Sequence, residues 1–298
     1  MATLGPAREL PPVAGRSGRR HSDRLRRGRS AVWLYIALAL GLVLMVGPFI
    51  YMLLGSFKTT GELRQVPPTW WPQQFTLSNY TDLFSRLNFS RFFFNSAVVA
   101  AAITAGNLLF CSMLGYALAK LRFPGKRALF ALVLGTLMVP GIVTFMPLFV
   151  LVANMGLVNT HAGLILPFLA GAFGVFLMRQ FISGIPDELL DAARVDGAGE
   201  YHIFFRIILP LCGAPLATLG ILTFLASWNN FLWPLVVAQT EDMYTLPVAV
   251  ALFATGQQTS NLGLLLAGAV VVVLPVLLVF IVLQRFFTQG IAMTGIKG

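Results

Sequence analysis

Residues 262–283 read LGLLLAGAVVVVLPVLLVFIVL and contain no charged side chain. A helix that crosses the hydrocarbon core of a membrane needs about 20 mainly apolar residues, so this run predicts a spanning helix. The rest of the 298-residue chain has a similar composition, with 57% hydrophobic and 11% charged residues. A soluble domain carries roughly 25% charged residues. The composition therefore excludes an ordinary water-soluble enzyme, a disordered protein and a disulfide scaffold.

The sequence predicts an all-α polytopic membrane protein with six transmembrane helices. Residues 128–178 contain no Asp, Glu, Lys or Arg and are too many for one span. We therefore divide this stretch into two spans at its polar segment, Asn154 to His161. Prolines inside the apolar runs predict kinked or broken helices. We expect residues 1–30 to be a basic, disordered cytoplasmic tail and residues 31–298 to form the transmembrane domain. The six candidate spans are Ala31 to Leu54, the uncharged stretch between Arg91 and Lys120, Ala128 to Ala153, Ala162 to Met178, Ile207 to Val237 and Leu262 to Leu283. The prolines are Pro140, Pro147, Pro167, Pro215 and Pro275.

The basic residues predict the orientation of these spans. With the N-terminus inside, 17 of the 21 Lys and Arg residues lie on the cytoplasmic side and four lie outside. Cytoplasmic loops of membrane proteins carry such an excess, so we expect both termini inside. Eight of the arginines precede residue 31. The net charge of +10 therefore indicates a tail that orients the chain and touches anionic lipid, with no nucleic-acid partner.

The spans lack the groups that would power transport or catalysis. None of them contains Asp, Glu, Lys or Arg, which argues against a proton- or sodium-coupled carrier and against an intramembrane hydrolase. The Gly-Lys pair in Phe123 to Arg127 lacks the Ser or Thr and the upstream glycine of a phosphate loop. The cysteines, Cys111 and Cys212, have no metal or disulfide spacing. We expect no catalytic residue, no metal and no bound cofactor, so the energy source must lie in another chain.

A loop at residues 183–210 has clear signals for a short surface helix. Pro186 suits a first helical position, and Asp187 and Glu188 suit the positive end of the helix dipole. Gly197 ends this helix, and a second helix starts near Glu200. Within the first helix, Asp191 and Arg194 are three residues apart and can pair.

The charge of this loop indicates a protein partner. The whole segment between the fourth and fifth spans holds three basic residues, Arg179, Arg194 and Arg206, and five acidic residues, whereas the other cytoplasmic segments are basic. A helix that rests on lipid is rich in Lys and Arg on its polar face. Docking into a partner protein therefore fits this loop better than resting on the membrane.

The spacing within the loop resembles a known signature. Asp191-Ala192-Ala193, three residues, Gly197, nine residues and then Ile207-Ile208-Leu209-Pro210 is similar to the cytoplasmic Glu-Ala-Ala-x3-Gly-x9-Ile-x-Leu-Pro signature of ABC-importer permeases, with Asp in place of Glu. Further stretches resemble the carbohydrate-uptake, maltose-type branch over residues 32–298. Among them are Met138-Val139-Pro140, Trp228-Asn229-Asn230-Phe231-Leu232-Trp233-Pro234 and Gly295-Ile296-Lys297-Gly298.

The resemblance implies a type I importer permease of the bacterial plasma (inner) membrane. Its partners would be a second permease, usually a different chain, two ATPase subunits that use ATP and Mg²⁺, and an extracytoplasmic solute-binding protein. The C-terminal residues Gly295, Ile296, Lys297 and Gly298 would dock on the ATPases, or be a frayed terminus. The resemblance assigns ATPase coupling to Asp191, Ala192, Ala193, Arg194, Asp196, Gly197, Ile207, Leu209 and Pro210.

Several alternatives stay open at this point. Trp228, Asn229 and Asn230 suit sugar contacts on the substrate path, and equally a structural corner at the end of a span. The paired tryptophans Trp70 and Trp71 suit a membrane-interface belt or a sugar platform. The cargo is a carbohydrate or, alternatively, a sugar phosphate such as glycerol phosphate. An ion-coupled carrier and a membrane anchor for an enzyme are the competing classes.

Overall fold

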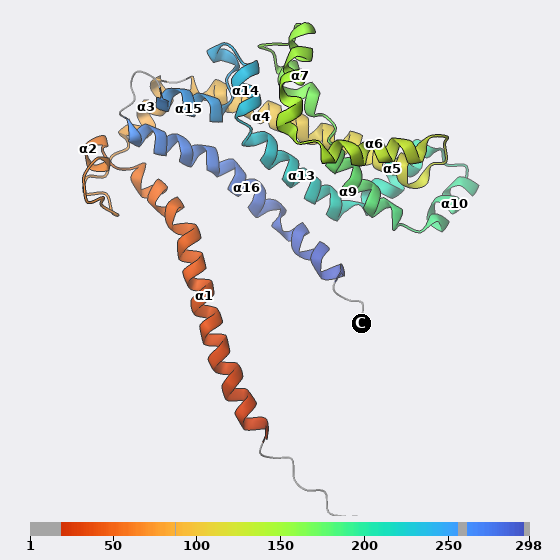
Figure 1. Ribbon diagram of the computed structural model, residues 1–298, viewed down its shortest axis with the longest axis horizontal. Helices are drawn as coiled ribbons and strands as arrows, with labels where there is room; N and C mark the ends of the chain where they lie inside the picture. Colours follow the sequence, from red (N-terminus) through yellow and green to blue (C-terminus); the bar gives the residue numbers. More distant parts are fainter. Residues whose placement is uncertain (1–18, 87, 256–260, 295–298) are drawn as a thin grey trace, which may run out of the picture. The chain divides into compact units, whose positions relative to one another are not determined.

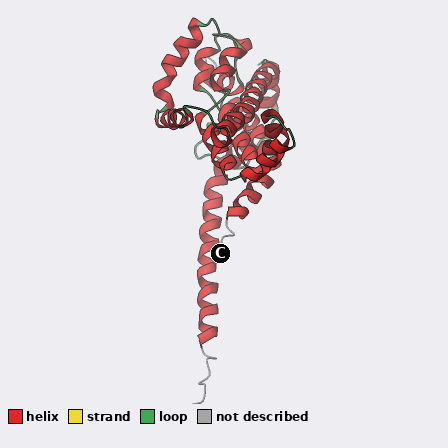
Figure 2. Cartoon of the chain, turned by 90° about the vertical axis from the view of Figure 1, so that its right-hand side faces the viewer, coloured by secondary structure: helices red, strands yellow, loops and turns green. Residues whose placement is uncertain are grey.

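The computed structural model describes residues 19–86, 88–255 and 261–294, and these residues form helices and connecting turns without a strand (Figure 2). The chain divides into two compact units, Met1–Tyr51 and Met52–Gly298. The all-α class is therefore confirmed for the described part of the chain.

The first unit consists of most of α1, Arg19–Gly55. Its segment Trp33–Gly55 is long and apolar enough to cross a membrane, as predicted for the first span. Its described side chains are apolar and exposed around the whole helix, which is the pattern of a helix surrounded by lipid or by other apolar surfaces. The helix begins inside the segment predicted to be a basic tail, and residues 1–18 lie outside the described part.

The second unit begins with two short helices and a long spanning segment. They are α2 (Thr60–Leu63) and α3 (Ser78–Arg86). The segment Phe89–Lys120 then runs through α4 (Phe89–Gly106), a π-helical turn and α5 (Ser112–Lys120) (Figure 1). This segment confirms the second predicted span.

The third and fourth predicted spans are each a bent pair of helices. α6 (Lys126–Met138) and α7 (Gly141–Asn154) meet at 105°. The bend lies at Pro140, which has no backbone N–H and keeps the preceding Val139 extended, at φ −84° and ψ 119°. The segment His161–Phe168, made of α8 (His161–Ile165) and a 3₁₀ turn that contains Pro167, meets α9 (Ala172–Ser183) at 41°.

Proline alone does not predict where these helices break. The bends near Pro140 and Pro167 confirm the predicted kinks. Pro147 and Pro275, in contrast, lie inside α7 and α16 without an interruption of either helix.

The fifth predicted span, 207–237, is not one helix. The segment Glu200–Leu211 meets α13 (Gly213–Trp228) at 81°, and the chain breaks again before α14 (Leu232–Val237). Glu200–Leu211 comprises α11 (Glu200–Ile203), a π-helical turn and α12 (Leu209–Leu211). After α15 (Leu246–Thr255), α16 (Leu262–Thr294) contains the last span, Leu262–Val282. The described residues thus hold three helices that can cross a membrane, or up to six spans if each bent pair counts as one.

Glycine brings α5 and α9 into close contact. A Cβ atom on Gly115 of α5 would lie 2.8 Å from the backbone nitrogen of Arg179 and 2.8 Å from Cβ of Met178. One on Gly174 of α9 would lie 2.8 Å from Sγ of Cys111. Small residues allow helix backbones in membranes to approach each other in this way. The two helices therefore pack along their length, as Figure 1 shows.

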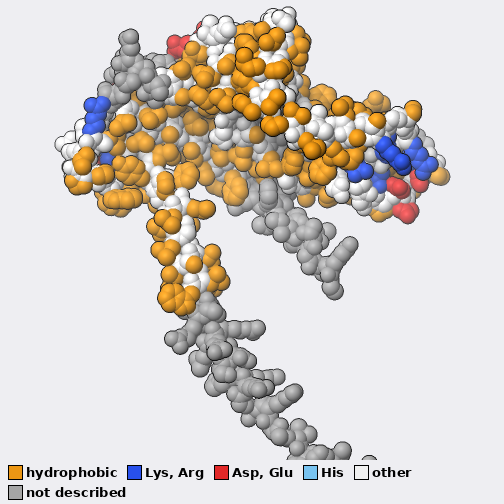
Figure 3. All heavy atoms as spheres, viewed as in Figure 1, with side chains coloured by type: hydrophobic (Ala, Val, Ile, Leu, Met, Phe, Trp, Pro, Cys, Tyr) orange, Lys and Arg blue, Asp and Glu red, His pale blue; other side chains and the backbone are white. Residues whose placement is uncertain are grey.

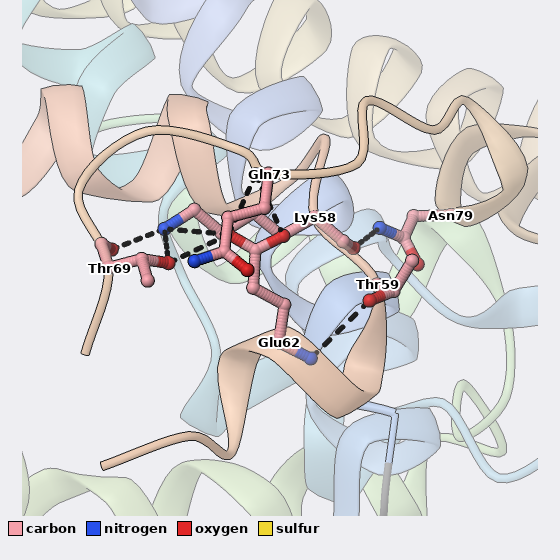
Figure 4. A network of polar contacts seen from close by, with 6 residues as sticks. All are labelled: Lys58, Thr59, Glu62, Thr69, Gln73 and Asn79. Atoms are coloured by element: carbon pink, nitrogen blue, oxygen red, sulfur yellow. Dashed lines mark hydrogen bonds and ion pairs between the residues drawn. The ribbon is translucent and has the colours of Figure 1, made fainter. Parts of the chain in front are cut away.

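A buried ion pair shapes the loop between α1 and α3 (Figure 4). Lys58 and Glu62 have side chains that are 1% and 4% exposed, with Nζ 3.8 Å from Oε1. The Thr69 hydroxyl donates to Glu62 Oε1 at 2.7 Å and accepts from Lys58 Nζ at 2.9 Å. The backbone N–H of Gln73 donates to Glu62 at 3.0 Å, and the Asn79 amide donates to the Lys58 carbonyl at 2.8 Å. Both charges are paired and hydrogen-bonded, as buried charges must be.

This network also sets the charge state of Glu62. Burial raises the pKa of the carboxyl group. The hydrogen bonds from Thr69 and from the backbone of Gln73, together with the Lys58 ammonium, outweigh burial and hold the pKa below its ordinary value. Glu62 is therefore ionised at neutral pH and holds the loop in one conformation.

Candidate functional site

The predicted short surface helix is present as α10, Asp187–Val195. It begins one residue later than predicted, with Pro186 at the N-cap position. At its end, the N–H of Gly197 donates to the Arg194 carbonyl at 3.0 Å and the N–H of Ala198 donates to the Ala193 carbonyl at 2.9 Å. This pair of bonds is the Schellman C-cap, and it requires the left-handed φ of +83° that Gly197 adopts.

One face of α10 is held in the core of the second unit. Leu190 is 1% exposed and packs in a cluster with residues of α9 and α11, including Ile182 and Ile203. The opposite side, with Asp191 and Ala192, is exposed. The helix is thus anchored by one apolar stripe and presents a charged, small-residue surface.

An ion pair fixes the N-terminal end of α10 to α5. Lys120, the last residue of α5, places Nζ 2.6 Å from Oδ1 of Asp187, and it also donates to the Ile185 carbonyl. The Lys120 side chain is 6% exposed, whereas that of Asp187 is 75% exposed. The hydrogen bond and charge of Lys120 lower the pKa of the Asp187 carboxyl group. This contact joins residues that are 67 positions apart in the sequence.

A second set of contacts fixes the C-terminal end of α10. Arg194 donates from Nη1 to Asp191 and from Nε to Glu200, both at 3.0 Å. The pairing predicted for Asp191 and Arg194 is therefore confirmed. The Tyr116 hydroxyl, on α5, donates to the other oxygen of Glu200. Tyr116 is 4% exposed, and its ring packs 5.6 Å from that of Phe204.

These contacts border a polar cleft of about 680 Å³ between α10 and the turn that follows α5. Charged side chains gather at this end of the second unit, in contrast to the mainly apolar surface elsewhere (Figure 3). A cleft of this kind suits recognition of charged groups on a partner. Its lining residues are Lys120, Leu121, Arg122, Phe123, Asp187, Leu190, Asp191, Arg194 and Glu200.

The end of the signature lies at the start of the bent fifth span. Ile207 and Leu209 are partly buried against the same core, and Pro210 is exposed. The fully buried residues are their neighbours Ile203 and Ile208, both 0% exposed. Ile207, Leu209 and Pro210 are therefore less buried than Ile203 and Ile208, which lie beside them in the same segment.

Sequence reasoning missed Tyr116 and Lys120 as anchors of α10. Neither residue stands out in the sequence as a partner of the loop at 183–210. A signal was present, since a tyrosine and a lysine four residues apart lie on one face at the end of a helix. Their partners, however, lie too far along the chain to be paired from spacing.

The residues predicted for the substrate path take three different positions. Trp228 is 2% exposed, and its ring N–H donates to the Val272 carbonyl at 2.9 Å. The Asn229 amide is exposed and donates to the Leu225 carbonyl of its own helix at 3.0 Å. Asn230 lines a cavity between α6, α9 and α13. The C-terminal docking residues Gly295 to Gly298 lie outside the described part of the chain.

Comparison with known proteins identifies this arrangement as that of a membrane transport subunit. Residues 111–293 match the family described as binding-protein-dependent transport system inner membrane component. The arabinooligosaccharides transport system permease protein AraQ of Halalkalibacterium halodurans is 42% identical over 270 residues, covering 89% of this chain and 96% of that protein. The lactose transport system permease protein LacG of Rhizobium radiobacter is 36% identical over 266 residues, covering 89% and 96%.

A solved structure shows the same fold. It is the crystal structure of a bacterial ABC transporter involved in the import of the acidic polysaccharide alginate, with a TM-score of 0.78 and 24% identity. The match covers 93% of this chain and 100% of that one. The chain therefore belongs to the family of binding-protein-dependent transport system inner membrane components, which are transport components and not enzymes.

Proposed function

We propose that this chain is the permease subunit of an ATP-driven importer that moves a carbohydrate across the bacterial plasma membrane. Relatives named for arabinooligosaccharide and lactose transport support the cargo class. The alternative cargo is a sugar phosphate such as glycerol phosphate. The partners would be a second permease chain, two ATPase subunits that consume ATP and Mg²⁺, and a solute-binding protein outside.

We further propose six spans with both termini in the cytoplasm. Three continuous helices and three bent pairs supply six segments that together are long and apolar enough. The Lys and Arg residues favour the side of the membrane that carries α10 and the turn after α5. Under this topology, the network of Lys58 and Glu62 lies outside, where a solute-binding protein docks.

The contacts that anchor α10 to α5 are the main support for a role of α10 in coupling to the ATPase subunits. Lys120 of α5 holds its N-terminal end, and at its C-terminal end Arg194 binds Glu200 of α11, which in turn accepts from Tyr116 of α5. A displacement of α10 should therefore move a long spanning segment with it. Its exposed side would enter a groove of an ATPase subunit. The coupling residues are then Asp191, Ala192, Ala193, Arg194, Asp196 and Gly197, with Ile207, Leu209 and Pro210 at the start of the next span.

Replacing Gly197 tests this proposal. Gly197→Asp puts a side chain at φ +83°, which costs about 1 kcal/mol and distorts the cap of α10. We expect normal membrane insertion, ATP hydrolysis by the partners, and uptake of labelled sugar at least about tenfold lower because the docking geometry is lost. Uptake is measured in proteoliposomes that contain the assembled importer.

Gly199→Asp is the matched control. Gly199 has an ordinary φ of −74°, and nothing lies within 4 Å of a Cβ atom built on either glycine. The control adds the same charge two residues away without backbone strain, so it should retain most of the uptake. Equal uptake by the Gly197→Asp variant and the unmodified importer would contradict a coupling role for α10.

A further inference from the structure

Three breaks in the chain meet at one cavity of about 890 Å³ in the second unit. They are the bend between α6 and α7, the bend before α9, and the end of α13. Val139, Gly141, Phe168, Gly171 and Asn230 contribute to its wall from these breaks. The volume lies in the range of cavities that hold small molecules.

Broken helices leave backbone groups without α-helical partners. Inside a membrane such groups are tolerated where they are buried in protein or line a wet cavity. The first residues of α9, Ala172 to Gly174, line this cavity, and the N-cap residue Gly171 provides no side-chain hydrogen bond. Their N–H groups are donors that the helix itself does not use.

Polar side chains in the wall also have unused hydrogen-bonding capacity. Ser227 Oγ is buried without a partner. Asn230 accepts from the Trp233 N–H at 3.4 Å, and its amide nitrogen has no acceptor among the residues that the structure describes. Thr136 and Thr144 donate to their own helix at 2.7 and 3.0 Å, which leaves their oxygens able to accept.

Among the described residues that line this cavity there is no Asp, Glu, Lys, Arg or His. A phosphate or carboxylate group would find no side-chain cation there, whereas a sugar hydroxyl can both donate and accept. We infer that this chain itself contacts the cargo in this cavity, that the cargo is an uncharged polyhydroxy compound, and that Asn230 and Ser227 bind it. The inference rests on the proposed transport function and adds to it a site and a charge class.

The neighbouring asparagines allow a matched test in the assembled importer. Asn230→Asp keeps the oxygen that accepts from Trp233 but replaces the free amide donor with a carboxylate. Asn229→Asp makes the same change outside the cavity. With labelled arabinotriose as the probe, we expect uptake about tenfold lower for Asn230→Asp and within about twofold of normal for Asn229→Asp. ATP hydrolysis stimulated by the binding protein should persist in both variants.

Ser227→Ala separates cargo contact from a structural effect. A hydroxyl that is only buried and unpaired destabilises the fold, so its removal would raise the melting temperature and leave uptake unchanged. That result would overturn the role of Ser227. We expect the opposite outcome, a several-fold loss of uptake without destabilisation. This variant also serves if Asn230→Asp fails to assemble.

The charge class has a separate test. Asn230→Cys, in a background with Cys111→Ala and Cys212→Ala, should react with a thiol reagent and be protected by arabinotriose. Equal or stronger protection by sn-glycerol 3-phosphate would overturn the inference of an uncharged cargo. Normal uptake by both aspartate variants would overturn the site and leave the transport function standing. No ATP-dependent uptake of arabinotriose, lactose or glycerol phosphate by the unmodified importer would instead refute the proposed function.

Discussion

The network around Glu62 and the ion pairs around α10 use the same chemical groups in opposite surroundings. Lys58 and Glu62 are almost completely buried, and each charge is satisfied within one loop. Around α10, the carboxylates of Asp187 and Asp191 are 75% and 69% exposed. The comparison shows that the chain fixes the loop between α1 and α3 with buried charges and leaves the carboxylates of α10 accessible to water.

The largest effect in this comparison is expected at Glu62. Glu62→Gln preserves the shape of the side chain but removes the carboxylate that pairs with the buried Lys58 ammonium. Breaking a buried pair in this way costs about 3 kcal/mol. Thermal unfolding of the purified complex should show a clear loss of stability, whereas the control Glu241→Gln, at an exposed position, should not.

Acid should reproduce part of this loss. The pKa of Glu62 is lowered on folding, so the stability contributed by its carboxylate is fully present above its ordinary value of 4.5. That stability is lost as the pH falls from 4.5 through the lower pKa of the folded state. The Glu62→Gln variant should lack this component, and an identical acid response in both proteins would contradict the network.

A smaller effect is expected at Tyr116. Tyr116→Phe keeps the ring packed near Phe204 but removes the hydroxyl that donates to Glu200, at a cost of about 1 kcal/mol. We expect less sugar transported per ATP hydrolysed, because the C-terminal anchor of α10 is weakened. Tyr201→Phe is the control, since Tyr201 is 75% exposed on the adjacent helix.

A double-mutant cycle sharpens this prediction. If the hydroxyl acts through Glu200, then Tyr116→Phe should have little further effect on the transport ratio once Glu200→Gln is present. Additive losses in the double variant would show that Tyr116 acts elsewhere.

The smallest effect is expected at Asp187. Its carboxylate is exposed, and exposed ion pairs contribute little because water and salt screen them. Asp187→Asn should change uptake by less than about twofold, and the Lys120 ammonium keeps its bond to the Ile185 carbonyl. A large loss of uptake would mean that Asp187 itself contacts the ATPase.

The sequence predicted local features well and distant contacts poorly. The bounds of α10, its cap at Gly197 and the pair of Asp191 and Arg194 all depend on residues a few positions apart. The contact of Tyr116 with Glu200 joins residues 84 positions apart, so no local pattern encodes it.

The spans show the same limit. Hydropathy located the apolar segments and gave 207–237 as one span, but it did not place the bends within it, because a bend leaves the composition unchanged. Proline located two breaks, yet Pro147 stays inside α7. Nothing in the sequence marks Lys58 and Glu62 as a buried pair, since a single sequence does not show which charges the fold will enclose.

The glycine contacts of α5 with α9 have a mechanical consequence. The α5 backbone approaches the α9 backbone at Gly115, and the Cys111 side chain, in the turn before α5, packs against Gly174 of α9, so a shift of one helix along the other would produce a steric clash. The two helices should therefore move as one rigid body. Lys120, which contacts Asp187 of α10, lies at one end of the pair, and Ala172, in the cavity wall, lies toward the other. A displacement of α10 at the Lys120 end should therefore be transmitted to the cavity wall at Ala172.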